Sequence, residues 1–277
     1  MHHSQRRKHS CIDMSGRAGS GRSARTNAHT VRQIRMPGCQ NGVMEFRSVT
    51  ADDGVQLHVA VCGSGPDVVV LSGGPGCVHY LADESLAPIG FRSWFPDPRG
   101  VASSGGGPHD MARGIADLEA IRRANDIDEW MVLGHSWGSD LAVRYAVDHP
   151  DRVRGIVGIA GHGLHLDREW SAAYEAGKAN ETPVEIDWMP EVHAALWRSF
   201  KDWVHQPTLW RALADSTVPM AFVAAGDDIR PSWPLQQLAA LVPDGGFEAV
   251  PDVPHDFWAT DPDFWQATCT TALRQLC

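Results

Sequence analysis

The sequence predicts an α/β fold built on a mostly parallel, doubly wound sheet with a helical cap. Short apolar runs alternate with helical patterns along most of the chain, and several of these runs end in glycine-rich or acidic turns. Between Gly161 and Ser216 the strand pattern stops, and tryptophans stand among helix formers. Alternating strands and helices are typical of a parallel sheet covered on both faces. A chain of 277 residues, 43% of them hydrophobic, can bury the core of one large domain or two small ones.

The first 40 residues differ from the rest in composition and charge. They carry eight Lys and Arg against one Asp, so their net charge is +7 and that of the remaining chain is −17. They lack apolar periodicity and the hydrophobic core of a secretory signal. We therefore expect a disordered basic tail over residues 1–40. We favour a true start at Met36 or Met44 over an organelle-targeting signal.

Charge and cysteine usage limit the classes of partner. The formal net charge of −10 argues against nucleic acid as the main partner. No apolar run approaches the roughly 20 residues of a membrane span, so no membrane partner is expected. The six cysteines form no C-x-x-C pair and have no metal-like spacing with histidine. They are interpreted as free thiols in a reducing compartment, which predicts a cytoplasmic protein.

The first half of the folded region is predicted as a hairpin followed by alternating strands and helices. Asp52-Asp53-Gly54 is a hairpin turn signal between two β-rich runs. Val68–Leu71 is apolar throughout, as expected for a strand buried on both faces. Apolar side chains recur at helical spacing between Asp110 and Ala124. The predicted elements are strands at 44–50, 55–62, 68–71, 91–96, 130–133 and 153–160, and helices at 110–124 and 140–148.

The second half contains the predicted cap and the rest of the sheet. The tryptophans of the cap are expected to form mostly its own core, and they could also pack across a homodimer. After the cap, strands are predicted at 218–225 and 247–250, and helices at 234–242 and from 262 to the end. The predicted domains are a tail over 1–40, an α/β core over 41–161 and 217–277, and a helical cap over 162–216.

The central motif is Gly134-His135-Ser136-Trp137-Gly138, which has the pattern G-x-S-x-G. It stands between the apolar run at 130–133 and a helical pattern, where a buried strand turns sharply into a helix. This context is typical of a nucleophile elbow, which exposes the serine hydroxyl above the sheet edge. Flanking glycines are required because side chains there would collide with the neighbouring strand or helix. Ser136 is therefore the predicted nucleophile.

A serine nucleophile requires a base within hydrogen-bond reach, and the base requires an orienting carboxylate. With this chain order the carboxylate follows the serine at the end of a later strand, and the histidine comes last. Asp227 and Asp228 compete for the first role; Asp228 is preferred because the Asp-Ile-Arg-Pro turn leaves directly from it. His255 is the predicted base, since it lies in the histidine-bearing loop after the last strand.

Backbone N–H groups are expected to stabilise the oxyanion of a tetrahedral intermediate. One is that of Trp137, the residue after the nucleophile. The other comes from the loop after the third strand, where Gly73-Gly74 lets the backbone approach closely, and Gly74 is the predicted donor.

These motifs together resemble the α/β-hydrolase superfamily, and more closely its proline iminopeptidase-like branch. The resemblance covers roughly Met44 to Leu276. It is carried by Gly73-Gly74-Pro75-Gly76, Asp97-Pro98-Arg99-Gly100, Gly134-His135-Ser136-Trp137-Gly138-Ser139, Asp228 and His255. It implies the α/β-hydrolase fold, with the cap inserted after the strand that follows the nucleophile helix. It also implies a triad of Ser136, His255 and Asp228, with no metal and no organic cofactor. A serine at the elbow, in place of aspartate, counts against epoxide hydrolase and haloalkane dehalogenase chemistry.

The sequence departs from this branch at several positions. Ser72 stands where the branch usually has histidine, and Pro98 replaces the glutamine of its Asp-Gln-Arg-Gly turn. The elbow of the branch is typically Gly-Gly-Ser-Trp-Gly, and His135 stands at its second glycine. The cap also looks short. Enzymes of the branch hold the substrate's free amino group with cap acids, for which the candidates here are Glu169, Glu175, Glu181, Glu185, Asp187 and Glu191.

The function predicted first is a serine hydrolase that acts through an acyl-enzyme on a small amide or ester, including an N-terminal proline amide. The substrate is a small molecule or short peptide. A carboxylesterase or lactonase acting on a small apolar ester is the nearest alternative. A ligand-binding protein or a cofactor-free lyase on the same scaffold is a third possibility.

Overall fold

The computed structural model describes residues 43–181 and 183–277. The disordered tail predicted over residues 1–40 therefore lies outside the described residues. Within the described part of the chain, no helix is long and apolar enough to cross a membrane.

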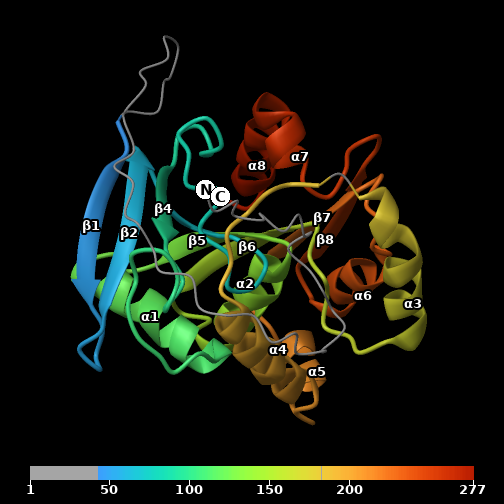
Figure 1. Ribbon diagram of the computed structural model, residues 1–277, viewed down its shortest axis with the longest axis horizontal. Coiled ribbons are helices and arrows are strands. Elements are labelled where there is room, and N and C mark those ends of the chain that lie inside the picture. Colours follow the sequence, from blue (N-terminus) through green and yellow to red (C-terminus); the bar gives the residue numbers. More distant parts are fainter. Residues whose placement is uncertain (1–42, 182) are drawn as a thin grey trace, which may run out of the picture.

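Eight strands form one sheet in the order β1-β2-β4-β3-β5-β6-β7-β8 (Figure 1). β2 pairs antiparallel with β1 and β4, and every other pairing is parallel. The predicted mostly parallel, doubly wound sheet is thus confirmed. The strands are β1 Glu45–Thr50, β2 Gln56–Gly63, β3 Asp67–Leu71, β4 Arg92–Pro96, β5 Trp130–His135, β6 Val153–Ile159, β7 Met220–Ala225 and β8 Gly245–Val250.

Helices cover both faces of the sheet (Figure 1). α1 Met111–Ala124, α2 Trp137–Asp148 and α6 Trp233–Leu241 pack on one face, while α7 Phe257–Thr260 and α8 Pro262–Gln275 pack on the other. The central strand β3 shows the consequence. Val69 and Leu71 belong to the first apolar core, and Val68 and Val70 belong to the second. Its continuous apolar sequence reflects burial on both faces.

Between β6 and β7 the chain forms α3 Arg168–Gly177, the 3₁₀ helix η1 Lys178–Asn180, α4 Pro190–Val204 and α5 Leu209–Ala214. These helices fall within the residues predicted as a cap. Of the tryptophans here, Trp170 and Trp203 are buried, whereas Trp210 is 45% exposed.

Two local features differ from the sequence prediction. The nucleophile helix begins at Trp137, because the backbone enters the helix directly after the turn, whereas the apolar pattern suggested a start at Asp140. The short helix α7 follows the His255 loop and was not expected from the sequence.

Candidate active site

Ser136 lies between β5 and α2 in a conformation that few non-glycine residues adopt, with φ +54° and ψ −128°. Two glycines make this turn possible. A Cβ on Gly134 would clash with the backbone of Gly138, and a Cβ on Gly138 would clash with the carbonyl of Leu71. The strand, turn and helix are thus packed too closely for side chains at these positions. This is the geometry expected of a nucleophile elbow.

The Asp228 and His255 side chains are in contact, and His255 lies against His135 of the elbow. His255 Nδ1 lies 2.5 Å from Asp228 Oδ2, and each of these side chains is less than a tenth exposed. Asp228 follows β7 and His255 follows β8, so both come from carboxyl ends of parallel strands, where ligands of such sheets bind. Asp227 is exposed instead. The geometry therefore favours Asp228 over Asp227 as the orienting carboxylate.

Ser136 and His255 are not joined by a hydrogen bond in the described part of the chain. Catalytic hydrogen bonds are often long in ligand-free enzymes and tighten with substrate, so this spacing is compatible with a nucleophile–base pair. The roles of Ser136 as nucleophile and His255 as base stay predictions from the sequence.

The loop after β3 packs directly against the nucleophile. A Cβ on Gly73 would lie 2.6 Å from Ser136 Cβ, and Gly74 has φ +123° with Cys77 Sγ 2.6 Å from the position of its missing Cβ. Only glycine fits at either place. Trp137 is the first residue of α2, so its N–H has no partner within the helix. Backbone donors from Gly74 and Trp137 thus lie on the two segments that flank Ser136.

A buried arginine, which the sequence analysis left without a role, contacts the predicted catalytic acid. Arg230 Nη1 donates to Asp228 Oδ1 at 3.0 Å and to Glu181 Oε1 at 2.5 Å. Burial opposes the charge on Asp228, but His255 and Arg230 outweigh it and hold the pKa of Asp228 well below its usual range. Asp228 therefore stays ionised throughout the neutral range. In the sequence, the Asp-Ile-Arg turn was a weak indication that Arg230 lies near Asp228. Nothing in the sequence indicated that Glu181 contacts Arg230.

His135 connects three segments of the site. The Gly73 N–H donates to Tyr80 Oη at 2.7 Å, and Tyr80 Oη lies 2.7 Å from His135 Nδ1. His135 Nε2 lies 3.1 Å from the carbonyl oxygen of His255. Burial lowers the pKa of His135 well below its ordinary value, so the ring is neutral. Because a carbonyl only accepts, Nε2 carries the proton and Nδ1 accepts from Tyr80. The sequence analysis quoted His135 within the motif but assigned it no role.

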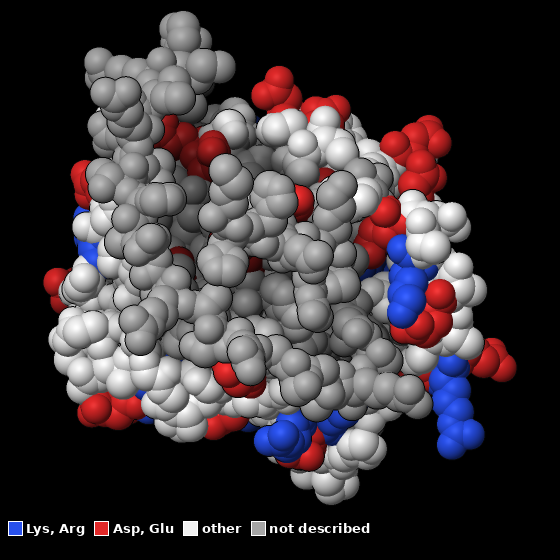
Figure 2. All heavy atoms as spheres, viewed as in Figure 1, with Lys and Arg blue, Asp and Glu red and all other residues white. Residues whose placement is uncertain are grey.

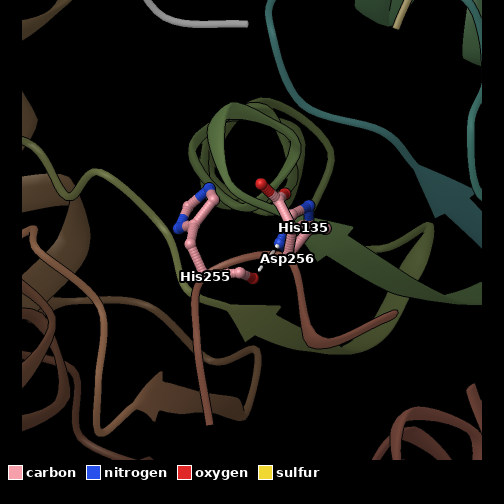
Figure 3. A group of neighbouring side chains, drawn as sticks. All are labelled: His135, His255 and Asp256. Carbon is pink, nitrogen blue, oxygen red and sulfur yellow. Dashed lines mark hydrogen bonds between the residues drawn. The ribbon is translucent and has the colours of Figure 1, made fainter. Parts of the chain in front are cut away.

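His135, His255 and Asp256 bring potential metal-ligating atoms within 4.8 Å of one another (Figure 3). Their contacts do not suit a metal. Both ring nitrogens of His135 are already hydrogen bonded, and Nδ1 of His255 is bonded to Asp228. Figure 3 also shows that the bond from His135 runs to the backbone of His255 and not to its ring. His135 and His255 are thus held by hydrogen bonds within the chain, and Asp256 Oδ1 accepts from Trp258 Nε1.

A pocket opens beside the loop after β3. Its volume is about 720 Å³ with the open mouth included, and its walls come from that loop, the loop after β4, α1, α2 and α4. Gly73 and Trp137 line it, but no residue of the His255 loop does. A second, smaller hollow lies beside His255.

The six acids considered for binding a substrate amine differ in exposure. Only the Glu181 side chain is buried, at 7% exposed, and it is bonded to Arg230. The other five are exposed: Glu169, Glu175, Glu185, Asp187 and Glu191. On the face shown in Figure 2, the acidic side chains of described residues are spread around the margin. Basic side chains lie among them and form no continuous patch in that view.

Comparison with known proteins agrees with this architecture. A family model described as the alpha/beta hydrolase fold matches residues 66–182. The chain is 31% identical over 159 residues to a proline iminopeptidase of Arabidopsis thaliana, which covers 55% of this chain and 38% of that protein. It is 30% identical over 118 residues to epoxide hydrolase 2 of Siraitia grosvenorii, which covers 40% and 37%. The matched regions thus span less than half the length of these curated relatives.

A solved structure extends the likeness over most of the fold. The crystal structure of a proline iminopeptidase from Mycobacterium smegmatis superposes with a TM-score of 0.60 at 20% identity, covering 84% of this chain and 98% of that one. Both sequence relatives named above are hydrolases by name. The chain therefore has the α/β-hydrolase fold and resembles the proline iminopeptidase-like branch of that superfamily, as its motifs predicted.

Proposed function

We propose that this chain is a serine hydrolase that cleaves a small ester or amide through an acyl-enzyme. The observation that carries the proposal is the 2.5 Å contact between His255 Nδ1 and Asp228 Oδ2. His255 is tied to the elbow through its carbonyl oxygen, which lies 3.1 Å from Nε2 of His135, the residue before Ser136. A carboxylate bound to Nδ1 leaves Nε2 as the nitrogen that accepts a proton from serine.

In the proposed reaction, Ser136 Oγ attacks the substrate carbonyl carbon and transfers its proton to His255 Nε2. The backbone N–H groups of Gly74 and Trp137 hold the oxyanion of the tetrahedral intermediate. His255 then gives the proton to the leaving alcohol or amine, and the acyl-enzyme remains. Water repeats the sequence, with His255 again as base, and the acid product leaves Ser136 free.

One observation favours an ester over a peptide with a free amino terminus. An aminopeptidase of this branch requires cap carboxylates for the substrate's amine. Five of the six candidate acids are exposed, and Glu181 is engaged with Arg230. A carboxylesterase or lactonase acting on a small neutral substrate is therefore the second candidate function. It differs from an aminopeptidase in needing no carboxylate that binds a substrate amino group.

The test is the initial hydrolysis rate on a proline arylamide and a short-chain aryl ester, with Ser136→Ala as blank and Ser171→Ala, at an exposed serine of α3, as matched control. Ester cleavage that only Ser136→Ala abolishes supports an esterase. Arylamide cleavage that N-acetylation of the substrate prevents supports an aminopeptidase. Labelling by a fluorophosphonate should require Ser136 in both cases. Absence of labelling together with absence of turnover contradicts the proposal and favours a binding protein.

Labelling without hydrolysis is the remaining outcome. It would indicate an activated serine that performs different chemistry, such as a cofactor-free lyase reaction. Product analysis by mass spectrometry would separate that case from hydrolysis.

We also propose a cytoplasmic location. The cysteine usage supports it: the six cysteines form no C-x-x-C pair and have no metal-like spacing with histidine, as is usual in a reducing compartment. Fractionation of the source cells would test this.

A further inference from the structure

The pocket beside the loop after β3 touches the predicted oxyanion site but not the predicted base. Gly73 and Trp137 belong to its wall, and the missing Cβ of Gly73 would lie 2.6 Å from Ser136 Cβ. No residue of the His255 loop lines it. The pocket thus adjoins Ser136 through its neighbours Gly73 and Trp137, and His255 lines a different hollow.

This placement distinguishes the two halves of a substrate. The leaving group receives its proton from His255, so it must lie on the His255 side of Ser136. The acyl group stays attached to Ser136 and extends in another direction. The pocket is therefore positioned for the acyl group, while the smaller hollow beside His255 is on the side of the leaving group.

The chemistry of the wall indicates what kind of acyl group fits. Its aliphatic and methionine side chains come from the sheet, α1, α2 and α4: Leu57, Leu71, Met111, Leu118, Ile121, Leu141 and Leu196. Such a surface gains free energy by covering hydrocarbon.

The charged side chains in the wall are already bonded within the chain. Arg99 is paired with Asp117, with two contacts of 2.8 and 2.6 Å. Asp110 accepts an N–H from the first turn of α1, and Asp97 accepts an N–H from the loop that follows it. Asp117 is thus neutralised by Arg99, while Asp97 and Asp110 are held by backbone N–H groups.

Three polar groups of the wall are different. Ser72 Oγ, His109 Nδ1 and Trp137 Nε1 are buried atoms that have no hydrogen-bond partner among the described residues. Buried polar groups are nearly always hydrogen bonded, so unpaired groups beside a pocket point to a polar atom supplied by what the pocket binds.

We infer that this pocket is the acyl-binding subsite, and that it accepts a neutral, mainly apolar acyl chain of several carbons in an ester substrate. The inference rests on the proposed function and extends it from the reaction type to the substrate class. It also explains why Gly114 of α1 lines the pocket. A Cβ added at Gly114 meets no atom within 4 Å, so this position leaves open space that a larger residue would fill.

The experiment compares kcat/KM for 4-nitrophenyl acetate, butyrate and hexanoate in the wild type, Gly114→Ala and Gly114→Phe. Each buried methylene should raise kcat/KM by up to about fourfold, so hexanoate should exceed acetate by about tenfold or more in the wild type. Gly114→Ala adds one methyl group and should keep this preference. Gly114→Phe should bring the hexanoate-to-acetate ratio of kcat/KM close to one, because the ring occupies the space that the longer chains need.

Two results would overturn the inference. The first is a wild type whose kcat/KM does not rise with acyl length. The second is a Gly114→Phe variant that slows acetate and hexanoate by the same factor, since that would indicate general damage.

Failure of the proposed function is recognised separately. If no ester is hydrolysed by any variant, binding of hexanamide and acetamide is measured by calorimetry. Tighter binding of hexanamide that Gly114→Phe abolishes would keep the pocket assignment without the hydrolase. Equal binding of the two amides would contradict the assignment of the pocket as an acyl-binding subsite.

Discussion

Two buried arginines each bridge a pair of carboxylates, one before the nucleophile in the chain and one after it. Arg99 uses Nε and both terminal nitrogens to bind Asp117 and Asp53, and it also donates to the carbonyl of Gly107. Arg230 reaches Glu181 and Asp228 through the single nitrogen Nη1, and its buried Nε has no partner among the described residues.

The difference lies in geometry. Arg99 forms a saturated, bidentate clamp that joins α1, the loop after β4 and the hairpin turn, and a rigid fork of this kind mainly fixes positions. Arg230 has fewer bonds, but it places its charge against the carboxylate that orients His255. The same chemical pairing therefore serves position in one region and electrostatics in the other.

The largest expected effect concerns the acid that Arg230 contacts. Asp228→Asn should lower kcat by about 10³- to 10⁴-fold, because an amide neither stabilises the imidazolium nor holds the required tautomer. Asp227→Asn, at the exposed neighbour, is the matched control and should change kcat by less than about twofold. Steady-state kinetics on the best ester would decide. Loss of turnover in Asp227→Asn with retention in Asp228→Asn would reverse the assignment.

Replacing Arg99, the centre of the clamp, should reduce the stability of the fold and leave catalysis unchanged. Arg99→Met leaves the buried Asp117 carboxylate with only the longer contact to Arg113, at 3.3 Å, and should lower the free energy of unfolding by up to about 3–5 kcal/mol. The folded fraction should keep its kcat, since Arg99 contacts no triad residue. Urea unfolding and activity at matched folded fraction would measure both. A kcat loss larger than the loss of folded protein would contradict the contrast between the two arginines.

Arg230 and Glu181 should move the acid limb of the kcat/KM–pH profile in opposite directions. Glu181→Gln leaves the Arg230 charge beside Asp228 less compensated and should shift the limb to lower pH. Arg230→Met removes that positive charge and should shift it to higher pH. Glu185→Gln, at an exposed acid four residues away, is the control. Shifts of the same sign in both variants would exclude the electrostatic role.

Asp140 shows what a buried carboxylate does without an arginine. It accepts the N–H of Gly163 at 2.9 Å, its Oδ2 is unpartnered, and no Lys or Arg of the described chain pairs with it. Burial raises the pKa of Asp140 from its ordinary 3.8 to about 8. The unfolded chain therefore loses this proton near pH 4, whereas the folded chain keeps it to about pH 8.

It follows that folded wild type should lose stability relative to Asp140→Asn as pH rises from about 4 to 8, because ionisation favours the unfolded state across this window. Thermal unfolding of both proteins at pH 5 and pH 8 would show the effect. Of the substitutions in these predictions, Asp140→Asn should change turnover at neutral pH the least. The same difference in melting temperature between wild type and Asp140→Asn at pH 5 and at pH 8 would contradict the prediction.

Much of the fold could be predicted because its signals are local. The apolar run of β3, the hairpin turn before β2 and the helical spacing of α1 each depend on neighbouring residues, and the observed elements lie within a few positions of those predicted. The helix start at Trp137 was missed because the first turn of α2 carries the elbow's residues and not an apolar face. The four-residue α7 is too short to show a period.

The support of the site could not be predicted in this way. Glu181 and Arg230 are 49 residues apart, Tyr80 and His135 are 55 apart, and His135 meets the His255 carbonyl across 120 residues. These contacts depend on how β3, β5, β7 and β8 are ordered in the sheet. A cap glutamate has the same local pattern whether it is exposed or bonded to a buried arginine.

The sequence by itself determined the α/β class, the elbow at Ser136 and the glycines that bring backbone close to it, because steric rules for glycine and side-chain periodicity act over a few residues. Only the tertiary structure decided which aspartate meets His255, that Glu181 is engaged with Arg230, and that a largely apolar pocket is lined by Gly73 and Trp137. Charge pairing, burial and cavities are properties of distant segments packed together, so they exist only once the sheet has set those segments side by side.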